Sequence, residues 1–214
     1  MSATYFSPLA ATRAEARKIQ VLFPDATLLA GPRATKAALQ QVRAPRILHI
    51  ASHGFFLGDG AHDRTTGELN PLLRSGLALA GANVTREGRA DGILTALEAS
   101  NLDLWGTKLV TLSACDTGIG EVRNGEGVYG LRRAFVLAGA ETLVMSLWPV
   151  SDYVARDAMV AYYTGLRAQI GRGDALRQAK LTMMKRTSRR HPYYWASFIQ
   201  SGEWADLDGR RERF

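Results

Sequence analysis

Short apolar runs recur along the chain, and each ends at glycine, proline or a polar loop. This pattern predicts strands, which are listed here by residue range: 26–30, 46–51, 76–80, 108–113 and 142–148. Residues 142–148 show no alternation of polar side chains, so this strand is expected to be buried on both faces. A weaker run at 195–201 predicts a last strand.

Segments with apolar residues at helical spacing lie between these runs. They predict the following helices: 12–23, 34–42, 93–100, 127–138, about 152–168 and 174–185. Gly139 is expected to end the fourth helix, and Ser151-Asp152 and Asp174 are expected to cap the starts of the last two. The alternation of strands and helices predicts an α/β fold with a mostly parallel central sheet. We expect a single domain over residues 1–203, followed by a polar tail at 204–214.

Two polar segments without periodicity, 54–74 and 118–125, predict loops. Long loops inside compact domains often carry function. In parallel sheets the site lies beyond the carboxyl ends of the strands. His53, Cys115 and Asp152 each fall just beyond a predicted strand end, and this shared location makes them candidate site residues.

The composition excludes several classes of protein. The 214 residues are 46% hydrophobic and 22% charged, as in ordinary globular domains. The net charge is +7, but most arginines are scattered and no aromatic residues interleave with the densest basic clusters, so no nucleic-acid partner is expected. No stretch reaches the roughly 18 apolar residues of a membrane helix, and no signal peptide is recognisable. A single cysteine excludes an intramolecular disulfide, and we expect a cytoplasmic protein.

Cys115 is a candidate nucleophile. A lone cysteine is most often a small buried hydrophobe, but this one follows a strand directly and precedes Asp116-Thr-Gly. A nucleophilic thiol needs a base, which is usually histidine. His49 lies within a predicted strand and is expected to be a satisfied core residue, and His191 lies in a basic loop. His53 is preferred, and His62 in the predicted loop 54–74 stays open as a second candidate.

Two sets of groups near His53 and Cys115 are candidates for binding an oxyanion or a metal ion. The backbone N–H groups of Gly54 and Cys115 are expected to bind an oxyanion together. His49 and His53 would share a zinc ion on a helix, but on a strand they lie roughly 13 Å apart. No metal and no cofactor are therefore expected.

A glycine motif offers a rival function. Gly125-Glu-Gly-Val-Tyr-Gly130 matches the dinucleotide fingerprint and opens a predicted helix, and Asp152 follows at the distance of a ribose-binding acid. The fingerprint should follow a strand at once, yet residues 114–124 intervene. The dinucleotide-binding reading is therefore the less favoured one.

Several motifs together resemble the CHAT domain, a caspase-like domain of bacterial proteins that often also carry tetratricopeptide repeats. They are His49-Ile-Ala-Ser-His53-Gly54, Leu112-Ser-Ala-Cys115-Asp-Thr-Gly118, the glycine motif at 125–130, and Ser146-Leu-Trp-Pro-Val-Ser-Asp152. The resemblance covers about residues 9–203. It implies a caspase–separase type fold, a three-layer sandwich. CHAT domains usually begin further upstream, so the usual N-terminal part of the domain is expected to be missing here.

The resemblance also implies an activity. It places a His–Cys dyad at His53 and Cys115, an oxyanion site at Gly54 and Cys115, and a pocket for a basic P1 side chain at Asp152 and Trp148. The expected function is that of a cysteine endopeptidase that cleaves proteins or peptides after a basic residue, without a cofactor. A regulatory repeat protein is an expected further partner, and a membrane partner is not. The alternative is a catalytically silent protease-fold module that serves interaction or signalling.

Overall fold

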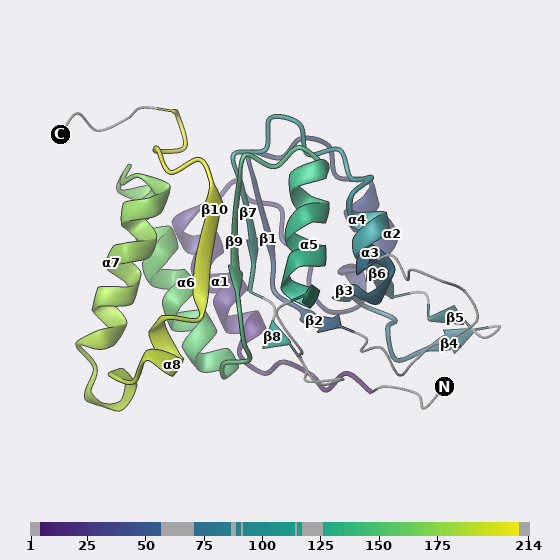
Figure 1. Cartoon of the computed structure of the whole chain (residues 1–214), viewed down its shortest axis with the longest axis horizontal. Helices are drawn as coiled ribbons and strands as arrows, with labels where there is room; N and C mark the ends of the chain where they lie inside the picture. Colours follow the sequence, from purple (N-terminus) through teal and green to yellow (C-terminus); the bar gives the residue numbers. More distant parts are fainter. Residues whose placement is uncertain are drawn as a thin grey trace.

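A sheet of four strands lies at the centre of the molecule, and helices cover both of its faces (Figure 1). This computed structural model describes residues 5–56, 71–86, 89–90, 92–113, 115–116 and 126–209. The strands of the central sheet, in spatial order, are β1 (Ile47–Ile50), β7 (Leu109–Leu112), β9 (Thr142–Ser146) and β10 (Phe198–Gly202). β1, β7 and β9 are parallel, and β10 is antiparallel to β9. The predicted mostly parallel central sheet is confirmed.

The two faces of the central sheet pack into two separate cores. Leu109, Val144 and Phe198 face one core with α1 (Thr12–Leu22), α6 (Asp152–Arg167) and α7 (Arg172–Met184). Their neighbours Val110, Leu143 and Met145 face the other core with α2 (Lys36–Gln40), α4 (Ala96–Ala99) and α5 (Glu126–Leu137). Every residue of β9 is buried, as predicted. The result is the α/β three-layer sandwich that the resemblance implies.

A second sheet of four strands carries the candidate catalytic residues. Its spatial order is β6 (Ile93–Thr95), β3 (Ser75–Ala78), β2 (His53–Phe56) and β8 (Cys115–Asp116). The chain enters β2 from β1 through Ala51-Ser52, and it enters β8 soon after β7. β2 and β8 are parallel, and β3 is antiparallel to both β2 and β6.

Smaller elements complete the described structure. They are the 3-10 turns η1 (Gly31–Arg33) and η3 (Thr187–Arg189), the short helices α3 (Pro71–Arg74) and α8 (Pro192–Trp195), and the strand pair β4 (Thr85–Arg86) and β5 (Arg89–Ala90).

Local structure differs from the sequence prediction at several points. Residues 26–30 form no strand, and the predicted helix 93–100 begins as strand β6 because Ile93–Thr95 pairs with β3. Thr95 then starts α4 with a capping box, in which its hydroxyl and the Glu98 carboxylate each bind the other's backbone N–H. Both ends of the predicted loop 54–74 are regular structure, since residues 54–56 belong to β2 and residues 71–74 form a short helix; residues 57–70 lie outside the described part of the chain. The predicted loop 118–125 lies wholly outside it.

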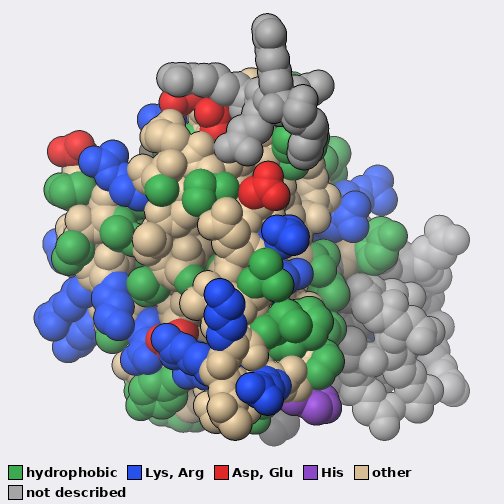
Figure 2. All heavy atoms as spheres, turned by 90° about the vertical axis from the view of Figure 1, so that its left-hand side faces the viewer, with side chains coloured by type: hydrophobic (Ala, Val, Ile, Leu, Met, Phe, Trp, Pro, Cys, Tyr) green, Lys and Arg blue, Asp and Glu red, His purple; other side chains and the backbone are tan. Residues whose placement is uncertain are grey.

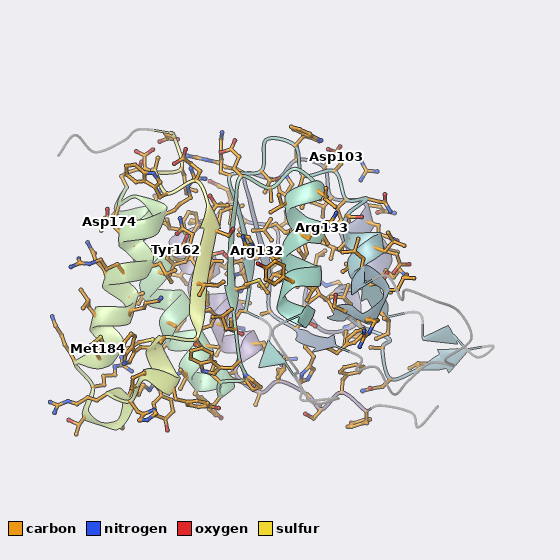
Figure 3. All side chains as sticks on the ribbon, viewed as in Figure 1. Asp103, Arg132, Arg133, Tyr162, Asp174 and Met184 are labelled. Carbon is orange, nitrogen blue, oxygen red and sulfur yellow. The ribbon has the colours of Figure 1, made fainter. Side chains whose placement is uncertain are left out.

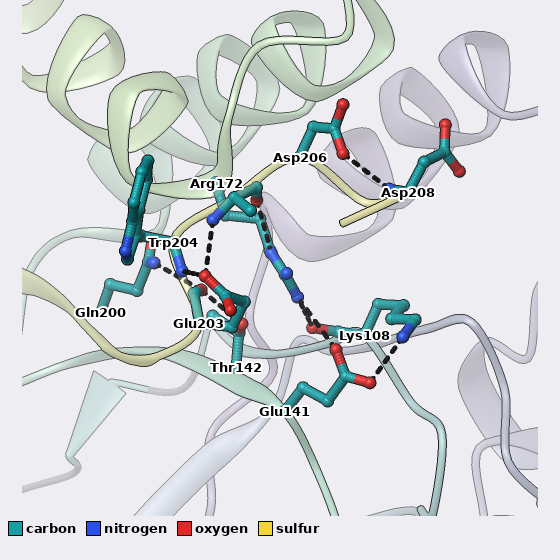
Figure 4. Close-up of polar contacts among 10 residues, drawn as sticks. Lys108, Glu141, Thr142, Arg172, Gln200, Glu203, Trp204, Asp206 and Asp208 are labelled. Atoms are coloured by element: carbon teal, nitrogen blue, oxygen red, sulfur yellow. Dashed lines mark hydrogen bonds and ion pairs between the residues drawn. The ribbon is translucent and has the colours of Figure 1, made fainter. Parts of the chain in front are cut away.

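α7 begins before the predicted cap. Its N-cap is Gly171, and Asp174 lies in the first turn, at the opposite end of the helix from Met184 (Figure 3). The first residue of the helix, Arg172, has a buried guanidinium, whose Nε donates to the carbonyl of Ala205 over 2.8 Å (Figure 4). Arg172 Nη1 donates to the Lys108 carbonyl, and Glu141 lies 3.7 Å away as its counter-ion.

Part of the predicted polar tail is packed against the domain. Ala205 and Leu207 are buried, and Leu207 belongs to the core that includes α6 and α7. Apolar contacts and the carbonyl of Ala205 thus hold residues 203–209 in place; residues 210–214 lie outside the described structure.

Gly202, at the end of β10, is expected to tolerate no side chain. Its φ is +98°, and a Cβ there would lie 2.1 Å from the Glu141 carbonyl oxygen. Gly106 has a similar φ of +86° but open space around it, so Gly106→Ala isolates the backbone strain, about 1–2 kcal/mol. We expect Gly202→Ala to lower the free energy of unfolding in urea by at least about 1 kcal/mol more than Gly106→Ala does. Equal losses would mean that β10 moves away from Glu141 without cost.

Candidate active site

The structure places His53 and Cys115 side by side. They are direct partners in the parallel pairing of β2 with β8, and Gly54 is the partner of Asp116. Neighbouring strands lie about 4.8 Å apart, so the two backbones are within reach of a shared substrate. Of Cys115 and Asp116, the structure describes the backbone alone. The juxtaposition of the two residues at strand ends, predicted from sequence, is present.

The register of this pair comes from the central sheet. β1 pairs with β7 from Ile47 opposite Leu109 to Ile50 opposite Leu112. The residue numbers of His53 and Cys115 differ by the same amount as those of these partners, so this pair continues the same register. The Ser113 N–H donates to the Ile50 carbonyl over 2.9 Å, which carries the pairing past the end of β7. The hydroxyl of Ser52 bonds the carbonyl of Ala78, and this fixes the turn between β1 and β2.

The imidazole of His53 is held in a defined orientation. The ring is buried, with 8% of the residue exposed, and the Phe6 ring lies 5.7 Å from it, centroid to centroid. His53 Nε2 lies 2.5 Å from the carbonyl oxygen of Ser7. A carbonyl only accepts hydrogen bonds, so Nε2 carries a proton, and in the neutral form of the ring the lone pair lies on Nδ1. Nδ1 is buried and, within the described residues, has no hydrogen-bond partner.

A hollow of about 360 Å³ opens beside His53. Its walls come from three segments: residues 6–9 and 12, the turn at 51–53, and residues 78–84 after β3, with Gly31 at the edge. Most of these side chains are small or apolar, so the hollow can recognise a bound group by its shape and has few charges to contribute.

Gly54 follows His53 in β2 and is buried between two strands. It is the register partner of Leu77 on β3 and of Asp116 on β8. Gly54 therefore lies in a strand and not in the loop that the sequence predicted. The oxyanion role of the Gly54 and Cys115 N–H groups stays a prediction.

The connection from β9 to α6 lies at the same end of the central sheet as β8 (Figure 1). In the sequence, Trp148 belongs to this connection and Asp152 follows it. Ser151 is the N-cap of α6 but makes no capping hydrogen bond with its side chain, and Asp152 is the first residue of the helix. The half-buried Asp152 has no hydrogen-bond or ion-pair partner among the described residues. The Trp148 indole Nε1–H donates to the Tyr193 carbonyl over 2.9 Å, so only its ring is available for another contact.

The other histidines have separate roles. His191 caps α8: its Nδ1 accepts from the Tyr193 N–H. His49 is the satisfied core histidine that the sequence predicted, with Nε2 2.9 Å from the buried Glu15 carboxylate and Nδ1 3.1 Å from the Tyr163 hydroxyl. His62 lies outside the described residues.

A buried polar chain therefore crosses from α1 to the central sheet. Glu15 contacts His49, His49 contacts Tyr163, and the Tyr163 hydroxyl donates to Thr111 Oγ1 on β7. Burial raises the pKa of Tyr163, so its hydroxyl stays protonated. The sequence predicted the buried role of His49 but not that of Glu15, because Glu15 looks like any other charged residue on an exposed helix.

The rival functions find little support in the geometry. α5 begins at Glu126, so Gly127 and Gly130 lie inside the helix, and residues 117–125 separate it from β8. Among the described residues no group of three His, Cys, Asp or Glu side chains is placed to hold a metal ion. Within the same segments, every helix is too short or too polar to span a bilayer.

Lysine and arginine side chains gather on the face formed by α7 and the residues after it (Figure 2). On this face the carboxylate of Asp157 on α6 pairs with Arg156, Arg186 and Arg189 at 2.7–2.8 Å. Burial raises the pKa of Asp157, but hydrogen bonds from Arg156 and Arg189 outweigh this and the pKa is lowered. This cluster is an ion-pair network that ties α6 to the segment after α7.

Ser7 and Asn83 are site residues that sequence reasoning missed. Ser7 precedes Pro8, which favours an extended backbone, but no local signal shows that its carbonyl meets His53. Asn83 lies in the polar segment after β3, and its partner Phe6 lies 77 residues away.

Comparison with known proteins identifies the family of this chain. Tetratricopeptide repeat protein 28 of human is 33% identical over 116 residues, and its mouse counterpart is 32% identical over the same length. The aligned part is 54% of this chain and 5% of each relative, so the chain spans a small part of those proteins. The family model of the CHAT domain matches residues 1–203. The chain belongs to the CHAT domain family, whose members have a caspase-like, cysteine-peptidase-like fold.

Proposed function

We propose that this protein is a cysteine endopeptidase in which His53 and Cys115 form the catalytic dyad. The observation that carries the proposal is the register of β2 and β8, which makes the two residues direct neighbours. Partners in a parallel ladder project from the same face of the sheet, so the thiol and the imidazole are expected on one side. The unpartnered, buried Nδ1 of His53 is the atom that would take the thiol proton.

The mechanism follows from the tautomer of His53. With Nε2–H held by the Ser7 carbonyl, Nδ1 accepts the proton of Cys115 and leaves a thiolate. The thiolate attacks the peptide carbonyl, and the imidazolium then donates its Nδ1 proton to the leaving amine. The acyl-thioester is hydrolysed by water, with the same nitrogen as base. The backbone N–H groups of Gly54 and Cys115 are the proposed oxyanion donors.

Asp152 supports a preference for a basic residue at P1. Its carboxylate lies at the carboxyl edge of the strands and has no described partner, so it is available for an arginine or lysine side chain. The ring of Trp148, pinned by its bond to Tyr193, would form a wall of that pocket.

Asp152→Asn separates this role from a structural one. Asn retains the shape of Asp, and the first-turn charge is worth about 0.3–1 kcal/mol, so the melting temperature should move by a few degrees at most. Loss of the charge opposite P1 Arg should cost roughly 1.5–3 kcal/mol, which lowers kcat/KM about ten- to a hundredfold for Arg-P1 peptides. Cleavage of peptides with an apolar P1 residue should change much less. Equal losses on both substrates would exclude Asp152 as the specificity residue.

The direct test of the activity uses a peptide electrophile that reacts with thiols and carries Arg at P1. Mass spectrometry of the digested protein should find the label on Cys115, and Cys115→Ala should take up none. The His53→Ala variant should react much more slowly than the wild type. If labelling of the wild type is no faster than that of a free thiol in an unfolded chain, the protein is the catalytically silent interaction module instead.

The relatives bear on partners as well. Both are named tetratricopeptide repeat proteins, and such repeats form extended binding surfaces. We propose a protein or peptide substrate and a regulatory repeat protein as the partners of this chain.

A further inference from the structure

The carbonyl that orients His53 belongs to a segment that two side chains bond by its backbone: Asn83 bonds Phe6, and the Thr12 hydroxyl donates to the Leu9 carbonyl over 2.8 Å. Residues 6–9, here called the strap, line the hollow beside His53. Asn83 Oδ1 accepts from the Phe6 N–H at 2.9 Å, and Asn83 Nδ2 donates to the Phe6 carbonyl at 2.8 Å. One amide therefore satisfies both backbone groups of one strap residue, as the edge of a β-sheet would.

The bond to Asn83 fixes the position of the next residue. Phe6 precedes Ser7, whose carbonyl accepts the Nε2–H of His53. Pro8 restricts the backbone of Ser7 to extended conformations, so an anchored Phe6 leaves the Ser7 carbonyl few directions. The Phe6 ring supports the same arrangement, with centroids 5.7 Å from the His53 ring and 5.9 Å from the Phe55 ring.

Asn83 and Ser7 are both exposed, so little of the folding free energy depends on them. The orientation of His53, by contrast, depends on the Ser7 carbonyl, and Asn83 fixes this carbonyl by bonding the neighbouring residue Phe6. A contact that matters little for stability can therefore matter for the imidazole.

We propose that Asn83 is a positioning residue for His53: by clamping Phe6 it holds the Ser7 carbonyl on Nε2 and so keeps the lone pair on Nδ1. The catalytic consequence rests on the function proposed above, whereas the effect on the tautomer does not. Without the clamp the Phe6 backbone loses both bonds and the Ser7 carbonyl moves away from Nε2. The proton then distributes between the two ring nitrogens, and part of the population loses its base.

The tautomer is measured directly by the ¹⁵N chemical shifts of the imidazole nitrogens near pH 8, where free histidine is neutral. The His53 signals are assigned by their loss in His53→Asn. Wild-type protein should show a single tautomer with the proton on Nε2, and Asn83→Ala should show a mixture. Asn83→Asp, which has the same shape but no amide donor for the Phe6 carbonyl, should resemble Asn83→Ala. Asn101→Ala, which removes another exposed bond from Asn to a backbone carbonyl, should match wild type.

Kinetics then test the catalytic role. Asn83→Ala and Asn83→Asp should lower kcat for peptide cleavage about 10- to 100-fold, with a small change in KM and a melting temperature within a few degrees of wild type. An unchanged tautomer in both variants would overturn the proposal, whatever the activity. A rise in kcat would overturn it too, because the strap would then be blocking the site. If the wild-type protein cleaves no peptide but the Asn83 variants show the expected tautomer mixture, the proposed peptidase function is wrong and the positioning role of Asn83 is retained.

Discussion

Cys115→Ala is expected to abolish peptide cleavage, and His53→Ala to lower kcat by about 10³-fold or more, because each removes one half of a dyad that acts as a unit. For the same reason the double variant should be little worse than Cys115→Ala alone. The measurement is cleavage of an Arg-P1 peptide at saturating concentration, with thermal unfolding to confirm the fold.

The matched control is His191→Ala. His191 is exposed and caps α8, so its removal should cost a little stability and leave kcat unchanged. Wild-type cleavage by His53→Ala would show that the base is misassigned, and His62 would then be the histidine to replace.

Glu15→Leu is expected to lower the free energy of unfolding by about 3–5 kcal/mol, the largest effect on stability anticipated here. The carboxylate is 1% exposed and bonds His49 Nε2, so its loss leaves a buried polar nitrogen without a partner. Urea denaturation measures the loss. Glu15→Gln retains a hydrogen-bonding side chain and should lose clearly less.

The double variant Glu15→Leu/His49→Leu separates the pair from its parts. Buried ion pairs are often replaced by apolar side chains at little cost, so the double variant should recover part of the loss of Glu15→Leu. Full recovery is not expected, because Tyr163 also loses its contact with His49. Additive losses from the two single variants would mean that Glu15 and His49 do not stabilise each other.

The sequence predicts the layers of this fold well, because the buried strands are continuous apolar runs with clear ends. β9 and α5 lie within a few residues of their predicted bounds. The sequence-based prediction is wrong at β6, because Ile93–Thr95 has only three residues and becomes a strand by pairing with β3. The prediction is also wrong at residues 26–30, where a strand was expected and none forms. This run is apolar enough for a strand, but it pairs with none of the strands in the described sheets.

The candidate site is predicted only in part, for a similar reason. His53, Cys115 and Asp152 stand out because a strand end marks each of them. The contacts that orient the imidazole come from Ser7 and Asn83, which lie 46 residues before and 30 residues after His53 and join it only in the folded chain. Neither residue has a local pattern that distinguishes it from other loop residues.

The unbroken register from β1–β7 to β2–β8 has a consequence for how this protein can vary. The alignment of the histidine with the cysteine depends on the number of residues that each strand places between the core and the site. Insertions in the other two walls of the hollow, residues 6–12 and 79–84, leave that number unchanged, so specificity can diverge while the reactive pair stays matched. One extra residue between Ile50 and His53 would turn the imidazole to the opposite face of the sheet. The position of the reactive pair thus depends on core strands that must be kept for folding, whereas the loops that form the other two walls of the hollow can change in sequence and length.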